Sequence, residues 1–168
     1  DPAMINRGQK RIVHNWMVEK IFGKWDVILN IQKPHSETPY LKGMWSYVKG
    51  SALVATGKLT QAEAELKNLE QQIIAKGVDD AGVGPTSASH LLSLAFNGLL
   101  GELSEAQGDL DGAIAAFSKA VQLEDNNSYI EPPDWPQSMR LYLGAALLAA
   151  KRAEDAEAVY LQDLEWNQ

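Results

Sequence analysis

A ladder of small residues recurs along this chain at fixed intervals, and it constrains the fold more than any other feature. In the first clear copy two glycines, an alanine and a leucine follow one another at intervals of 7, 5 and 4 residues. Two later copies keep these intervals, and a weaker upstream copy keeps the spacing without the residue types. The copies are Gly50, Gly57, Ala62 and Leu66; Gly101, Gly108, Ala113 and Phe117; Gly144, Lys151, Ala156 and Tyr160; and, upstream, Trp16, Gly23, Ile28 and Gln32.

This spacing is typical of two antiparallel helices whose backbones approach closely. We expect the first glycine of each copy to leave room for the partner helix, at close contact with the alanine of the second helix. The second glycine ends the first helix with a positive φ, which glycine adopts without steric cost. In the last complete copy Lys151 stands where that second glycine is expected.

The segments between these marks repeat at the helical period of 3.6 residues, and none alternates at period 2 for long enough to form a strand. Thr38 followed by Pro39 predicts a helix start with proline at its first position. Thr60-Gln61-Ala62-Glu63 matches a capping box, which predicts a second start at Thr60. The sequence therefore predicts an all-α fold.

These residues resemble the tetratricopeptide repeat (TPR) family, whose unit of 34 residues is a helix-turn-helix with this ladder. The best copy runs from Leu100 to Ala120, and Gly23 and Gly57 are 34 residues apart. The resemblance implies a right-handed superhelix of antiparallel helix hairpins with about 7–8 helices. It also implies one domain over 1–168, with a degenerate repeat at about 8–32 and repeats at about 43–76, 94–125 and 137–168.

Longer distances between the later ladders predict two insertions in this scheme. We expect the first to divide between a second helix lengthened to about Lys76 and the loop 77–86. The second is 126–134, where prolines forbid a helix until about residue 136.

A narrower resemblance concerns the C-terminal part of longer, uncharacterised bacterial TPR proteins. It rests on Trp25, Tyr47, the stretch Glu131-Pro-Pro-Asp-Trp135 and the run Leu-Gly-Ala-Ala-Leu-Leu from Leu143. It implies an architecture without an activity, and we expect the chain to be a fragment of a longer protein.

Charge and composition exclude several functions. Fifteen Lys and Arg against 22 Asp and Glu give a net charge of −7, which disfavours nucleic acid and anionic membrane surfaces as partners. The chain has no cysteine, which excludes a thiolate metal site, and no apolar run long enough for a membrane span or signal peptide. We expect a soluble protein, cytoplasmic or periplasmic.

Motifs for catalysis and metal binding are missing. No zinc-protease, nucleotide-binding or serine-hydrolase motif occurs. His14, His35 and His90 are 21 and 55 residues apart, so no two form a metal pair on one helix face. We expect no enzyme activity, no catalytic residue, no metal and no cofactor.

In the TPR family the first helices build a concave surface, and the resemblance places candidate binding residues there. TPR domains that bind the C-termini of chaperones carry lysine, asparagine and arginine at clamp positions on their first helices. This sequence has no such residues at the corresponding positions. Glu102 and Glu105 suggest an acidic groove, and Trp135 in the second insertion either fills the core or lines the surface. The predicted groove residues are Tyr47, Ser51, Glu102, Glu105, Trp135 and Arg140.

The leading functional hypothesis is a non-catalytic scaffold that binds a protein or peptide segment, basic and with an apolar anchor, in a concave groove. One alternative is a small-molecule or regulatory sensing domain whose pocket is closed by the inserted loops. Another is an enzyme whose catalytic domain lies elsewhere. The final segment carries Val159, Tyr160, Leu161 and Leu164, which suggests a homodimer through the terminal repeat.

Overall fold

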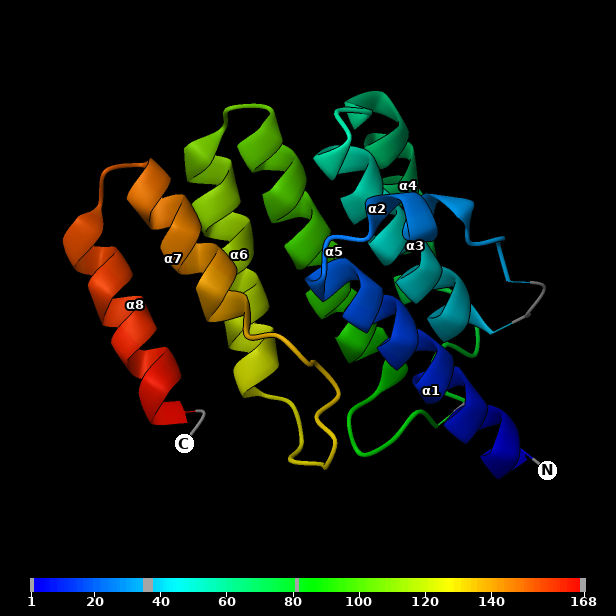
Figure 1. Cartoon of the computed structure of the whole chain (residues 1–168). Helices are drawn as coiled ribbons and strands as arrows, with labels where there is room; N and C mark the ends of the chain where they lie inside the picture. Colours follow the sequence, from blue (N-terminus) through cyan, green and yellow to red (C-terminus); the bar gives the residue numbers. More distant parts are fainter. Residues whose placement is uncertain (1, 35–37, 81, 167–168) are drawn as a thin grey trace.

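The computed structural model describes residues 2–34, 38–80 and 82–166, and over these residues the chain forms eight α-helices and no strand. The all-α prediction is confirmed. Successive helices run antiparallel in four pairs, and Figure 1 shows the pairs stacked side by side. The helices are α1 (Pro2–Ile21), α2 (Trp25–Asn30), α3 (Pro39–Ala55), α4 (Leu59–Ile73), α5 (Ala88–Ala106), α6 (Leu110–Asp125), α7 (Met139–Ala149) and α8 (Ala153–Trp166).

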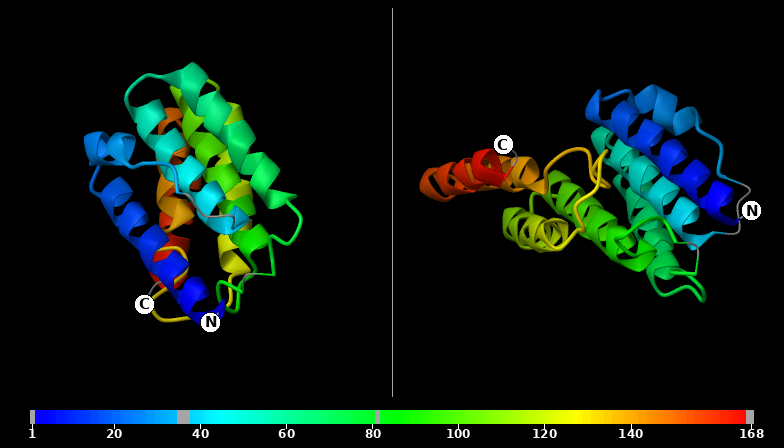
Figure 2. Two further views of the ribbon diagram at one scale, coloured as in Figure 1. Left: turned by 90° about the vertical axis from the view of Figure 1, so that its right-hand side faces the viewer. Right: turned by 90° about the horizontal axis from the view of Figure 1, so that it is seen from below.

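The second helix of each pair packs against the first helix of the next pair, and in the first three pairs the first helices also pack against one another. Helix α3 contacts α1 on one side and α5 on the other, while α4 contacts α5 and α6 contacts α7. The view from below in Figure 2 shows that α1 and α8 lie at opposite ends of this stack.

The turn between the two helices of each pair has the same backbone geometry in all four pairs. Gly23, Gly57, Gly108 and Lys151 have φ values of 64°, 73°, 82° and 61°. Each donates its N–H to the carbonyl three residues earlier, and the next residue donates to the carbonyl five residues before it. These two bonds define the Schellman motif, which satisfies carbonyls at a helix end. The positive φ predicted for the second glycine is confirmed, and Lys151 adopts the same conformation although it is not a glycine.

The first glycine of each ladder faces a different neighbour from the one expected. A Cβ atom on Gly101 would lie 2.4 Å from the ring of Phe117, and one on Gly144 would lie 2.3 Å from the ring of Tyr160. At Gly50 the nearest atoms belong to Leu99 of the next pair, 2.5 Å away. At Gly101 and Gly144 the aromatic residue at the fourth ladder position fills the space that the glycine leaves, while at Gly50 a leucine of the next pair fills it.

Helix starts agree only in part with the sequence signals. Helix α3 begins at Pro39, as predicted, although the Thr38 hydroxyl donates to Gln9 Oε1 and does not cap the helix. The capping box at Thr60 was wrong: α4 begins at Leu59 directly after the Schellman turn, so Thr60 already lies inside the helix. Helix α4 ends at Ile73, three residues before Lys76.

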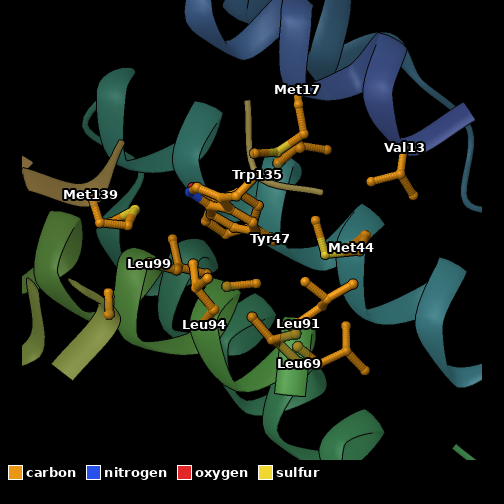
Figure 3. Close-up of a cluster of buried hydrophobic side chains, with 14 of the residues drawn as sticks. Val13, Met17, Met44, Tyr47, Leu69, Leu91, Leu94, Leu99, Trp135 and Met139 are labelled. Atoms are coloured by element: carbon orange, nitrogen blue, oxygen red, sulfur yellow. The ribbon is translucent and has the colours of Figure 1, made fainter. Parts of the chain in front are cut away.

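The buried apolar residues form a core that continues from α1 to α8, and Trp135, directly after the second insertion, contributes to it. Trp135 lies beside Tyr47 with ring centroids 5.3 Å apart, and Met17 of α1 points toward them (Figure 3). Both insertions lie at the end of the stack opposite the short turns, as Figure 1 shows. They touch there, since Ser128 donates its backbone N–H to Thr86 Oγ1.

Candidate functional site

A cavity of about 590 Å³ lies where the first helices of all four pairs meet, together with the start of α2. Its walls are mainly apolar, and its polar groups come from α1, α3, α5, α7 and the segment before α7. The lining residues are Lys20, Ile21, Gly23, Trp25, Ser51, Val54, Ala55, Glu102, Glu105, Ala106, Gln137, Leu141, Tyr142 and Ala145.

Lys20 connects α1 with α5 and α7 at one wall of this cavity. Its ammonium lies 2.7 Å from Glu102 Oε1 and donates a hydrogen bond of 2.8 Å to the hydroxyl of Tyr142. Tyr142 in turn donates to Gln137 Oε1. The ammonium also lies 4.7 Å from the ring centroid of Tyr142 and 5.3 Å from that of Tyr47, which are cation–π distances.

Burial and charge act in opposite directions on Lys20. Burial alone would lower its pKa, but the carboxylate of Glu102 and the two tyrosines outweigh it, so that the pKa lies well above its usual value. Burial also raises the pKa of Tyr47, against the effect of Lys20, and the tyrosine stays neutral. Lys20 and Glu102 therefore form a charged pair whose two charges cancel within the wall.

Two other polar groups of the cavity, Glu105 and Ser51, do not take part in the Lys20–Glu102 pair. Burial raises the pKa of Glu105, and the nearby charge of Glu102 raises it further. The hydroxyl of Ser51 is buried and has no hydrogen-bond partner among the described residues. Since Lys20 neutralises Glu102, the remaining negative charge at the cavity is that of Glu105.

One pair of helices matches a known protein family. Residues 86–128, which contain α5 and α6, match the tetratricopeptide repeat family. The chain carries a tetratricopeptide repeat. No curated protein and no solved structure matches the chain. The match confirms the predicted TPR family and, with the helices above, an all-α TPR-like fold; TPR proteins commonly act as protein-interaction scaffolds.

Three of the predicted groove residues meet at the cavity, namely Ser51, Glu102 and Glu105. Tyr47 does not line it and is 1% exposed, beneath Lys20. Trp135 is 6% exposed and fills the core against Tyr47. Arg140 lies on the side of α7 that faces α6, where its guanidinium holds both carboxylate oxygens of Asp125 at 2.7 and 2.8 Å.

Lys20, Trp25, Gln137 and Tyr142 line the cavity and were missed. The repeat ladder contains a signal for the first of them: Lys20, Val54 and Glu105 each follow the first ladder residue by four, and all three face the cavity. Gln137 and Tyr142 have no such signal, because the second insertion determines where α7 begins.

No group of three or more His, Asp or Glu side chains within 2–34, 38–80 and 82–166 could hold a metal ion. His90 Nε2 lies 2.8 Å from the backbone oxygen of Leu123, and His35 lies outside the described residues. Among the helices that the structure describes, none has the length and apolar character needed to cross a bilayer.

Proposed function

We propose that this TPR protein is a non-catalytic scaffold that binds a protein or peptide segment in the 590 Å³ cavity between its first helices. The observation that supports this most is the origin of the lining residues, which come from all four helix pairs. A ligand there would contact residues more than 100 positions apart in the chain, as in binding surfaces of other helical repeats. The TPR family is generally non-catalytic, which agrees with this proposal.

The chemistry of the cavity favours a basic segment with an apolar side chain beside the charge. Glu105 supplies a partly exposed carboxylate, and Lys20 already pairs with Glu102. Trp25, Val54 and Leu141 supply apolar wall. A Lys or Arg of the ligand would pair with Glu105 while its neighbour packs against this wall, whereas an acidic segment would be repelled.

A library of immobilised peptides with randomised sequences tests this proposal. The protein should enrich peptides with Lys or Arg next to an apolar residue, and the enrichment should fall as salt rises. Glu105→Gln should weaken binding of the selected peptides, while Glu157→Gln, on the exposed face of α8, serves as the matched control and should have no effect. Equal binding by both variants, or enrichment of acidic peptides, contradicts the proposal.

We also propose that the four pairs form one domain with the repeat bounds predicted above. Support comes from the core, which contains buried residues of both end pairs, such as Val13 and Ala156. Unfolding in urea should then show a single transition by fluorescence and by circular dichroism. Two separated transitions would divide the chain into independent units.

A homodimer through the terminal repeat is a further part of this proposal. Leu161 and Leu164 of α8 are 54% and 66% exposed, and Leu148 of α7 is 51% exposed. Pairing of two such faces would remove this apolar surface from water. Sedimentation velocity should detect a dimer that Leu161→Gln with Leu164→Gln abolishes; a monomer at high concentration would contradict it.

A further inference from the structure

The two end helices of the stack each have a side to which no further pair is added within the described residues. Helices α2, α4 and α6 each pack against the first helix of the following pair, whereas α8 packs mainly against α7. Helix α1, a first helix, packs against α2 and α3. Figure 2 shows α1 and α8 at opposite ends of the stack. One end therefore presents a second helix, and the other presents a first helix.

The uncovered side of α8 is apolar with carboxylates at both ends. Glu154, Ala158, Leu161 and Glu165 follow one another at intervals of 4, 3 and 4 residues, which places them on one stripe of the helix, and all four are exposed. Leu164, beside this stripe, is exposed as well. We call these five residues the C-terminal face.

The uncovered side of α1 has the same spacing with the opposite charge. Arg11, Asn15, Val18 and Phe22 are also 4, 3 and 4 residues apart, and Val13 faces the core from the other side of the helix. Phe22, directly after α1, is 72% exposed, which is unusual for a phenylalanine. We call Arg11, Asn15, Val18 and Phe22 the N-terminal face.

Charge distinguishes the two ends further. Helix α8 has five Asp or Glu and no Lys or Arg, while α1 has four Lys or Arg and one Glu. Lys10 and Lys20 of α1 pair with Asp134 and Glu102 of the same chain, and Arg11 is an exposed cation of the N-terminal face. Two α8 helices side by side would bring their carboxylates together, which is unfavourable, whereas α8 beside α1 brings opposite charges together.

We propose that the C-terminal face of one copy of this chain packs against the N-terminal face of a second copy. The stack then continues from one molecule to the next, and successive helices stay antiparallel across the contact. This orientation brings the Glu165 end of α8 to Arg11 and the apolar part of α8 to Val18 and Phe22. The inference rests on the self-association through the terminal repeat proposed above and names the surface that the repeat meets.

Such a contact joins two different faces, so each copy in a dimer keeps one free face and longer assemblies form as the concentration rises. Rising salt should weaken the association, because it screens the attraction between α8 and α1. Pairing of two α8 helices should respond in the opposite sense, since salt screens their repulsion. Sedimentation velocity of the parent protein at low and high salt measures this difference without any substitution.

Mixing two variants, each blocked at one face, tests the proposal directly. The first carries Arg11→Glu with Phe22→Gln, and the second carries Leu161→Gln with Leu164→Gln. Each variant alone should have a dissociation constant for self-association about tenfold higher or more than the parent. An equimolar mixture should restore a dimer, which does not grow longer, because each variant supplies the face that the other has lost.

Ile74→Gln is the matched control, since Ile74 is an exposed apolar residue after α4 and belongs to neither face; this variant should associate as the parent does. Circular dichroism checks that the variants are folded, and the salt dependence of the parent decides the question if one is not. The proposal is overturned if the Arg11 and Phe22 variant associates like the parent, if the mixture stays monomeric, or if salt strengthens association. In the first and third cases the homodimer through α8 still stands, whereas a parent that is monomeric at high concentration contradicts both.

Discussion

The ring of Phe117 in α6 lies against the bare backbone of Gly101 in α5, where a Cβ atom would come within 2.4 Å of ring carbon Cε1. Phe117 has no exposed surface, and Gly101 is buried with it. Gly144 and Tyr160 repeat the relationship in α7 and α8 at 2.3 Å. The aromatic ring on the second helix can therefore pack this closely only because the facing residue on the first helix is a glycine.

Gly101→Ala should therefore destabilise the protein although alanine favours helices. We expect a loss of about 1–3 kcal/mol in the free energy of unfolding, because the ring must move in a closely packed core. Urea denaturation measures it. In the background of Phe117→Leu the same change should cost much less. Gly8→Ala is the control, since a Cβ there meets nothing within 4 Å, and it should be neutral or stabilising. Equal effects at Gly8 and Gly101 would contradict the packing argument.

Lys151→Gly should stabilise the protein. Lys151 has φ 61°, where an L side chain carries steric strain that glycine does not. Part of the gain is lost through the more flexible unfolded chain, which leaves up to about 1 kcal/mol. The melting temperature should rise by a few degrees in calorimetry. Gly108→Ala, at the equivalent turn with φ 82° and open space around the Cβ, should shift it downward. A lower melting temperature for Lys151→Gly would refute this account.

Lys20→Met should cost about 3 kcal/mol, because it leaves the Glu102 carboxylate in the cavity wall without its partner. Adding Glu102→Gln should restore much of the loss in a double-mutant cycle. Lys24→Met removes the more exposed pair with Glu19 and should cost less than about 1 kcal/mol.

The Lys20–Glu102 pair should lose its contribution to stability only at alkaline pH. Since the folded pKa of Lys20 is raised, its contribution is complete at neutral pH and disappears only as the pH rises through that raised value. A loss of the pair's coupling free energy near neutral pH would contradict this assignment.

Glu124→Gln should make stability less dependent on pH. Burial raises the pKa of Glu124 to about 7, against the hydrogen bond that Oε2 accepts from the backbone N–H of Met139. The folded state then binds more protons than the unfolded state between the unfolded value and about 7, so this group makes stability fall as the pH rises through that window.

Glutamine can still accept from Met139 and has no charge to bury. The variant should be more stable than the parent at pH 8, by no more than about 3 kcal/mol, and nearly equal to it at pH 4. Urea denaturation at both pH values measures the difference, with Glu157→Gln as an exposed control. If Glu124→Gln is less stable than the parent at pH 8, the effect has the opposite sign to the one expected, and burial of the Glu124 charge is not its cause.

The spacing of residues along the sequence determined the helix pairs and the turns between them. The 7, 5 and 4 intervals predicted helix pairs and a positive φ at the glycine turns, because a Schellman turn depends on a few consecutive residues. Lys151 adopts the same turn without a glycine. The same intervals placed Ser51, Glu102 and Glu105 on first helices, and the structure brings these three to one cavity.

Only the tertiary structure decided which groups meet across the stack. Lys20 reaches Glu102, 82 positions away, and Tyr142, 122 positions away, because the stacked pairs bring α1 near α5 and α7. The buried place of Trp135 depends on how the second insertion folds back against Tyr47. Such contacts are set by the geometry of packed helices and by the path of a proline-rich segment, and neither leaves a periodic signal in the sequence.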